Sequence, residues 1–136
     1  ATVTATAQRY GFTSSEELRT LTGMASGNAV ENWTSTRDCG SFLSQVYAGT
    51  LVSKNASERM MQLLLGQTRR TKIPAGVPSG VKVANKTGEL AAVQNDVAIV
   101  FGTHPYVLAV MSNDISSAVA PSQITELSRA VWDAAQ

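Results

Sequence analysis

Residues 83–90, with the sequence VANKTGEL, are the stretch on which the fold assignment depends. The stretch begins as an apolar strand and carries the triplet Lys86-Thr87-Gly88. A Lys-Thr-Gly triplet alone is common by chance, and by itself it indicates only the exposed end of a strand. Residues 69–80 before it contain two prolines and two glycines, which is typical of a fixed, irregular connection. We therefore predict a strand over residues 81–86 with the triplet at its end.

Two more strands and a helix are predicted after the triplet. Residues 96–101 and 106–111 are apolar runs rich in Val and Ile, as in strands covered on both faces. The break between them favours an antiparallel hairpin. Pro121 then begins an amphipathic helix over residues 121–136. Three antiparallel strands within residues 81–113, with helices packed on the sheet, are the expected architecture.

Two helices are predicted before the sheet, within residues 34–66. The first begins at Ser35 or Thr36 and stops at Gly49, and Ser53 caps the second. The apolar side chains of the first helix recur at helical spacing; they are Cys39, Phe42, Leu43, Val46 and Tyr47.

The N-terminal third of the chain gives weaker signals. Residues 1–8 are either the end of a helix or an extension of small residues, and residues 23–32 are predicted to form a loop. The order of elements over the whole chain indicates an α+β fold. At 136 residues the chain is long enough for a single domain and too short for two.

Composition argues against several classes of function. The 11 Lys and Arg nearly balance the 10 Asp and Glu, and aromatic residues are only 6%, so we expect no nucleic-acid partner. No apolar stretch is long enough to span a bilayer. Cys39 is the only cysteine and His104 the only histidine, so we expect no internal disulfide, no metal site and no cofactor.

Several reactive or bulky side chains are interpreted as structural. His104 lies beside Pro105 in the predicted hairpin turn, where a solvated side chain is expected. Cys39 is interpreted as a small core residue, and Trp33 and Trp132 as packing residues.

The ordered motifs resemble the C-terminal half of serine β-lactamases and penicillin-binding proteins. Residues 32–38, NWTSTRD, are similar to the N-x-T-T-x-R-D stretch that opens the helix after the omega loop of class A β-lactamases. The other similar segments are the following helix (53–64), the approach to the active-site strand (73–78) and the next two strands (95–100 and 106–110). The resemblance covers residue 34 to the end and, loosely, the chain from Tyr10. Residues 1–33 would then be an omega-loop-like region.

The resemblance implies a site on the first strand for substrates that carry a carboxylate beside a reactive acyl group. Lys86 and Thr87 would bind that carboxylate, since an ammonium and a hydroxyl offer it charge-assisted and directional partners. Gly88 would let the substrate approach the backbone closely. The backbone N–H of Glu89 would be one of two oxyanion-hole donors, a contribution of about 3 kcal/mol in the transition state. The side chain of Glu89 need not participate.

Other residues of such an active site are expected outside this chain. The family's nucleophile lies in a Ser-x-x-Lys motif at the start of a helix, and Ser53-Lys54 has the wrong spacing for it. Ser26-Gly27-Asn28 is interpreted as a polar loop instead of the family's Ser-x-Asn motif. The deacylating Glu of class A enzymes has no counterpart with the right spacing, although Glu16, Glu17 and Glu31 lie in that region. This departure is consistent with a penicillin-binding or peptidase-like relative that releases its acyl group slowly.

The resemblance also implies a cation beside the site and a place in the cell. Arg69, Arg70 and Lys72 are interpreted as a solvated basic turn, one of which could supply an extra cation near the substrate carboxylate. The family is bacterial and associated with antibiotic resistance, so we expect a secreted or cell-envelope-exposed protein, although no signal peptide is visible in this chain.

Two functions follow as hypotheses. The first is a serine hydrolase that transfers the acyl group of β-lactams or D-Ala-D-Ala-like substrates, with this chain as its C-terminal portion. The second is a non-catalytic binding or structural module without the nucleophile. In either case we expect the isolated chain to be inactive. It should expose an apolar surface that associates with the missing N-terminal half or with another copy of the chain.

Overall fold

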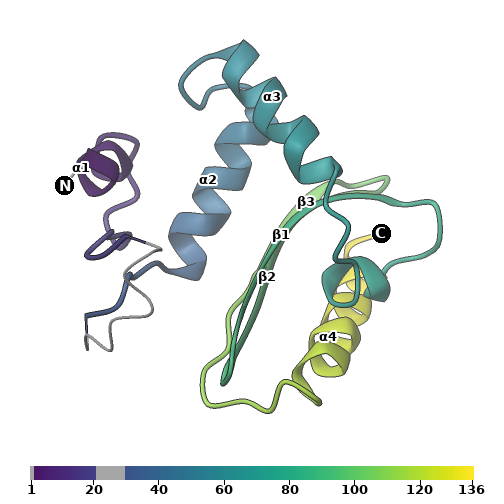
Figure 1. The fold of residues 1–136 in the computed structure, drawn as a ribbon. Coiled ribbons are helices and arrows are strands. Elements are labelled where there is room, and N and C mark those ends of the chain that lie inside the picture. The colour runs from purple at the N-terminus through teal and green to yellow at the C-terminus, as the bar shows by residue number, and fades with distance from the viewer. Residues whose placement is uncertain (1, 21–29) are drawn as a thin grey trace.

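The computed structural model describes residues 2–20 and 30–136 (Figure 1). It confirms the α+β fold and the predicted order of elements, and of the two alternatives for residues 1–8 it shows the helix. The elements are α1 (Thr2–Arg9), α2 (Thr36–Ala48), α3 (Lys54–Leu65), the short 3-10 helix η2 (Ile73–Gly76), β1 (Lys82–Leu90), β2 (Val93–Phe101), β3 (Tyr106–Val110) and α4 (Ala120–Ala135).

The three strands form one antiparallel sheet in the order β1-β2-β3. β1 continues four residues beyond its predicted end, because residues 87–90 pair with residues 93–96. The triplet Lys86-Thr87-Gly88 therefore lies inside the strand, and the prediction that it closes the strand is wrong. Only Ala91 and Ala92 connect β1 to β2. This two-residue turn joins β1 and β2 into one long antiparallel hairpin.

The helix ends follow the sequence signals closely. The Ser35 hydroxyl accepts the N–H of Asp38 at the start of α2, and the Ser53 hydroxyl accepts the N–H of Ala56 at the start of α3. Gly49 ends α2 in the left-handed conformation, at φ 72°. Such caps satisfy backbone groups that have no partner inside the helix.

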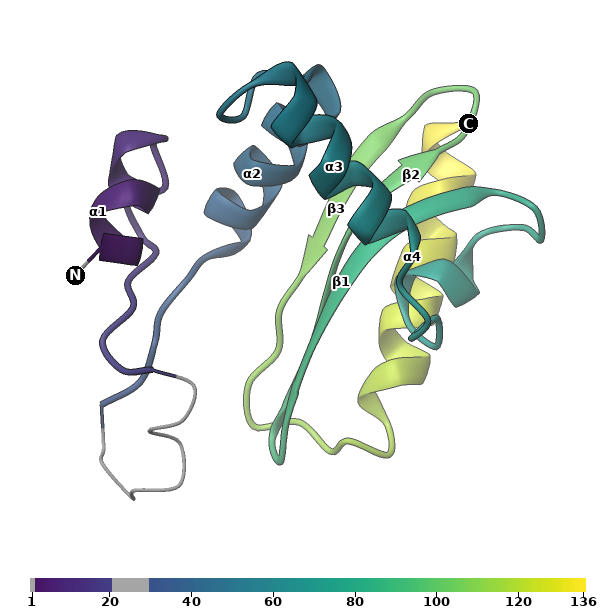
Figure 2. The same ribbon diagram turned by 45° about the horizontal axis from the view of Figure 1, so that its top comes forward.

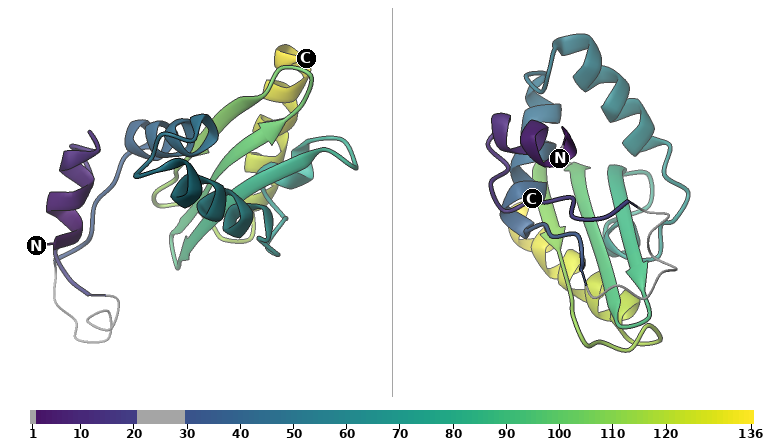
Figure 3. Two further views of the ribbon diagram at one scale, coloured as in Figure 1. Left: turned by 90° about the horizontal axis from the view of Figure 1, so that it is seen from above. Right: turned by 60° about the vertical axis from the view of Figure 1, so that its left-hand side comes forward.

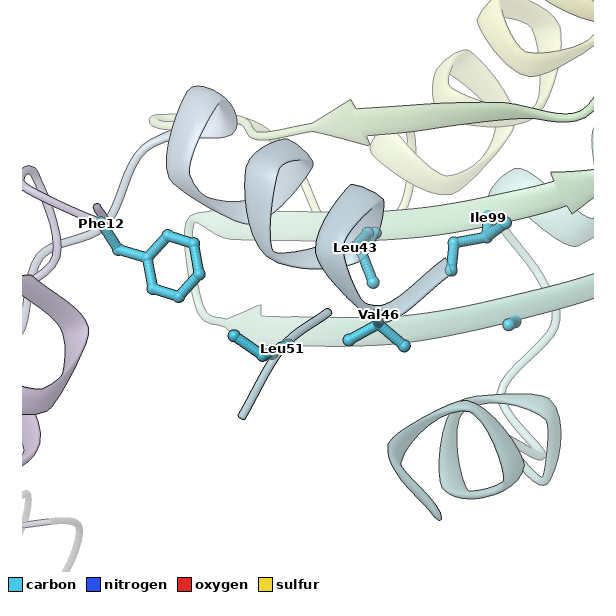
Figure 4. Packing of buried hydrophobic residues seen from close by; sticks show 6 residues of the cluster. Phe12, Leu43, Val46, Leu51 and Ile99 are labelled. Atoms are coloured by element: carbon cyan, nitrogen blue, oxygen red, sulfur yellow. The ribbon is translucent and has the colours of Figure 1, made fainter. Parts of the chain in front are cut away.

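Helices cover both faces of the sheet (Figures 2 and 3). α2 and α3 lie on one face, called here the α2–α3 face, and α4 with η2 lies on the other, called the α4 face. Figure 4 shows the core of the α2–α3 face, where Leu43 and Val46 of α2 pack over Ile99 of β2. The core of the α4 face is built from Ile73, Val83, Ala98, Val100 and Ile124. Strand residues alternate between these two cores because successive side chains point to opposite faces.

The N-terminal segment is attached at the outer side of α2. α1 stands away from the sheet, with α2 between them (Figure 3), and Phe12 packs on Phe42 with ring centroids 5.9 Å apart. The buried carboxylate of Asp38 accepts the N–H of Ser14 at 2.9 Å and the hydroxyl of Ser15 at 2.7 Å. Asp38 therefore holds this segment to α2.

The two tryptophans have different environments. Trp132 packs against the core of the α4 face, which confirms that it is a packing residue. The same prediction for Trp33 is wrong: its side chain is exposed, and only its backbone is engaged, in an isolated bridge with Glu16. In the described part of the chain no helix has the length and apolarity needed to cross a membrane.

Candidate active site

The free edge of β1 presents backbone groups to a potential ligand. Among the described strands β1 pairs with β2 alone, so its other edge is unpaired. In an antiparallel strand both backbone groups of a residue point to one edge, and alternate residues point to opposite edges. The Val83 carbonyl accepts a hydrogen bond from the Arg70 side chain at 3.4 Å, and the Thr87 carbonyl accepts one from the Lys86 side chain. Both carbonyls therefore point to the free edge. Glu89 lies two residues after Thr87 in β1, so its N–H points to the free edge as well.

The side chain of Lys86 borders a hollow on the α2–α3 face. The hollow measures about 360 Å³ and is lined mainly by apolar atoms of α2, α3 and the segment before α2. The lining also includes the polar residues Ser15, Thr34 and Asp38. The ammonium of Lys86 folds over the strand and donates to the carbonyl of Thr87. One cation therefore lies between an unfilled hollow and the free edge of β1.

Thr87 and Glu89 lie on the other side of β1, where two cations meet them. The carboxylate of Glu89 accepts a hydrogen bond from Lys72 Nζ at 2.8 Å and one from Arg69 Nη1 at 3.3 Å. Lys72 is only 2% exposed and also donates to the carbonyl of Asn95 at 3.1 Å. The interpretation of Lys72 as part of a solvated turn is thus wrong, because η2 brings its side chain under the hairpin. Arg69 remains largely exposed.

The electrostatics of Glu89 follow from these contacts. The hydrogen bond from Lys72 lowers the pKa of Glu89 most, and burial opposes it. The charge of Lys72, a hydrogen bond from Thr87 and the charge of Arg69 lower the pKa further. Glu89 is therefore an anion held by two cations.

A buried polar network supports the strand from below. The carboxylate of Asp96 in β2 accepts the N–H of Ile73 and the side-chain amide of Asn85, both at 3.0 Å. The Asn85 amide also donates to the carbonyl of Arg69 at 3.3 Å. Burial raises the pKa of Asp96, while these hydrogen bonds and the charge of Lys72 lower it. The network fixes β1, β2 and η2 to one another next to the triplet.

Gly88 is not required by packing within the chain. A Cβ at this position would meet only the side chain of Asn95, at 3.7 Å, which is an ordinary contact. The expected role of Gly88, a close approach of the substrate to the backbone, stays a prediction.

The remaining candidate residues do not gather around the triplet. The Ser26-Gly27-Asn28 stretch lies outside the described residues. Glu16 and Glu17 engage Trp33 and Thr4 through their backbones, and Glu31 forms an ion pair with Arg19 at 2.5 Å. In the described residues no group of three or more His, Cys, Asp or Glu side chains is arranged to hold a metal ion.

One Ser-x-x-Lys spacing does occur in the chain, although the nucleophile motif is predicted to lie outside it. It is Ser79-Gly80-Val81-Lys82, in the connection between η2 and β1. Ser79 and Lys82 are both exposed, and Gly80 has a φ of +90°. The spacing places a lysine beside a serine only on a helix, where residues three apart share a face. The pair therefore lacks the helical context of a nucleophile motif.

The family model for the beta-lactamase enzyme family matches residues 1–135. The chain belongs to this family. No curated protein matches this beta-lactamase-family chain.

Solved structures have the same fold as this member of the family. A β-lactamase from Sphaerobacter thermophilus is 24% identical with a TM-score of 0.89, over 98% of this chain and 52% of its own. The extended-spectrum β-lactamase TLA-3 is 25% identical with a TM-score of 0.89, over 97% of this chain and 53% of its own. PBP-A is 25% identical with a TM-score of 0.83, over 96% and 49%. The beta-lactamase-family chain thus spans about half the length of these structures.

Sequence reasoning missed the polar support of the triplet in this beta-lactamase-family chain. Asn85 and Asp96 are polar residues within otherwise apolar strands, and a buried polar group needs hydrogen-bonding partners. That pattern was a usable signal for a network. No local signal distinguishes buried Lys72 from exposed Arg69, because only the path of η2 separates them.

Proposed function

We propose that this chain is the substrate-binding half of a serine hydrolase that transfers acyl groups from β-lactams or D-Ala-D-Ala-like substrates. The observation that carries the proposal is the free edge of β1, which combines the N–H of Glu89 with the Lys86 ammonium beside a hollow. Membership of the beta-lactamase enzyme family supports the same reaction class. A similar structure, a variant of PBP-A, is an acyl-enzyme complex with penicillin G.

In this proposal each residue of the triplet has a separate task. Lys86 and Thr87 hold the substrate carboxylate, and the Glu89 N–H stabilises the negative oxygen that forms when the acyl carbon is attacked. Backbone donors suit this task because the strand fixes them before the reaction, so they do not reorganise as charge develops. The buried network of Asn85 and Asp96 holds β1 in that position.

The nucleophile and the second half of the oxyanion hole come, in this proposal, from a preceding segment that packs on the α2–α3 face. The chain spans about half of the similar structures, so a partner of comparable size is expected there. An apolar groove of about 420 Å³ lies between α1, α2 and α3 and is lined by residues such as Val3, Phe42 and Met60. Val52 in its lining is an exposed apolar side chain, and Leu63 is another on α3. Burial of this surface would stabilise the contact between the halves.

Acylation of the full-length protein tests the proposal. A labelled penicillin should form a covalent adduct that intact-mass and peptide mass spectrometry place on a serine outside residues 1–136. Lys86→Ala should slow acylation about 10- to 100-fold, the loss expected for one charge-assisted hydrogen bond. Lys54→Ala, a change at an exposed lysine of α3, is the matched control and should leave the rate unchanged.

Two results separate this proposal from its alternatives. Absence of any serine adduct would reject acyl transfer and favour the non-catalytic module. Sedimentation of the isolated chain tests the proposed surface: self-association, relieved when the preceding segment is supplied, supports it, and a monodisperse monomer contradicts it. A secreted or envelope-exposed location is part of the proposal, and fractionation of the native host checks it.

A further inference from the structure

The carboxylate of Glu89 is bound in the way that a ligand carboxylate would be bound. One of its oxygens accepts from Lys72 at 2.8 Å and the other from Arg69 at 3.3 Å. Thr87 lies two positions earlier on the same side of β1, and its hydroxyl also lowers the pKa of Glu89. Thr87, Lys72 and Arg69 therefore form an anion-binding cluster, and the chain's own side chain fills it.

The three partners differ in how freely they could leave Glu89. Lys72 is 2% exposed and is also held by the Asn95 carbonyl, so its ammonium stays in place. Arg69 has a side chain that is 69% exposed, so it can turn toward another anion at little cost. The Thr87 hydroxyl can rotate, but it cannot fully serve two carboxylates at once. A ligand carboxylate must therefore compete with Glu89 for Thr87 and Arg69.

We propose that Glu89 is a specificity-determining residue, whose side chain competes with carboxylate groups for the anion-binding cluster on β1. The inference rests on the proposed function, because Thr87 is the hydroxyl assigned there to the substrate. A tethered anion acts at an effective concentration of about millimolar or above, so it weakens a free carboxylate without excluding it. Two carboxylates in one cluster also repel each other. The protein should thus prefer carboxylate-bearing acyl donors less strongly than it would without the Glu89 side-chain charge.

Glu89→Gln is the decisive variant, because it removes the charge and keeps the size and the backbone N–H. In the full-length protein, acylation by a penicillin is compared with acylation by the methyl ester of the same penicillin. We expect the acid-to-ester ratio of rates to rise about tenfold in the variant, the value of one charge-assisted hydrogen bond. An unchanged ratio would overturn the inference. A purely structural role for Glu89 would slow both substrates together.

Acetate binding gives a readout that does not depend on acylation. The N–H signal of position 89 is followed by NMR during acetate titration, and the variant should bind acetate about tenfold more tightly than the wild type. Equal affinities would contradict the inference. If penicillin does not acylate the protein but acetate behaves as expected, the proposed function fails and the anion competition stands.

Two more variants serve as controls. Glu58→Gln removes an exposed carboxylate from α3 and should change neither the acid-to-ester ratio nor acetate binding. Arg69→Gln removes a cation whose side chain is 69% exposed, and should weaken acetate binding in either background. This second variant keeps the inference testable if Glu89→Gln does not fold, since unchanged acetate binding in Arg69→Gln would reject the cluster as an anion site.

Discussion

The two faces of the sheet are built differently. On the α4 face, η2 and α4 pack so closely that a Cβ on Gly76 would lie 2.5 Å from the Thr125 carbonyl oxygen. The Ser128 hydroxyl bonds the Ile73 carbonyl at 2.8 Å across the same contact. On the α2–α3 face, hollows of about 360 and 420 Å³ remain beside α2 and α3. The chain thus packs the α4 face closely and leaves hollows on the α2–α3 face.

This difference places the site at a boundary. Thr87 and the side chain of Glu89 belong to the closed α4 face, and Lys86 belongs to the α2–α3 face. In the proposed function, the closed face would hold the backbone donors in position, and the hollow on the α2–α3 face would leave room for a ligand and a nucleophile. Rigid support under an accessible edge is what a preorganised site requires.

The largest expected effect comes from breaking the buried network of the closed face. Asp96→Ala removes the acceptor of Ile73 N–H and of the Asn85 amide, so the buried Ile73 N–H loses its partner and the amide keeps only the Arg69 carbonyl. We expect a loss of about 3–5 kcal/mol in the free energy of unfolding. Urea denaturation measures it, and a loss below about 1 kcal/mol would show that water replaces the carboxylate. Asp96→Asn, which keeps one oxygen, should cost less.

A pair of glycine substitutions compares packing on the two faces directly. Gly76→Ala inserts a methyl group against the Thr125 backbone and should cost about 1–3 kcal/mol. Gly40→Ala is the matched control in α2, where a Cβ meets nothing within 4 Å, and should stabilise by up to about 1 kcal/mol because Ala favours helix. Thermal melts give both values. Equal changes in stability for the two variants would show that the two faces are packed equally closely at these positions.

The ion pairs of Glu89 predict how acid affects stability. The pKa of Glu89 is lowered in the folded chain, so its contribution is present above its ordinary value of 4.5 and is lost as pH falls through the lowered value. The stability difference between wild type and Glu89→Gln should therefore shrink between about pH 5 and pH 3. Denaturation at a series of pH values tests this. A difference that stays constant would mean that the ion pairs contribute nothing.

The smallest effect is expected on the unfilled face. Leu63 on α3 is 77% exposed, so Leu63→Gln should change the free energy of unfolding by less than about 0.5 kcal/mol. It should nevertheless reduce self-association of the chain, measured by light scattering. Leu43→Ala, at a position 1% exposed in α2, should cost about 2–5 kcal/mol by comparison. A destabilisation of similar size at Leu63 would mean that this surface is already packed.

The sequence determined the elements because their signals are local. Ser35, Ser53 and Gly49 fixed the helix ends through caps, and the apolar runs of β2 and β3 fixed the strands. The order of motifs also determined the family. The extension of β1 past the triplet was missed because residues 87–90 are not an apolar run, and pairing with β2 alone makes them a strand.

Only the tertiary structure decided the surroundings of the triplet. Arg69 and Lys72 lie three positions apart in the connection after α3, yet Arg69 is exposed and Lys72 is buried. The turn of η2 carries the Lys72 side chain under the hairpin. Burial of a cation requires an anion and a carbonyl, which come from Glu89 and Asn95 on two different strands. Residues 17 to 23 positions apart meet there, and no local pattern in a sequence encodes such a contact.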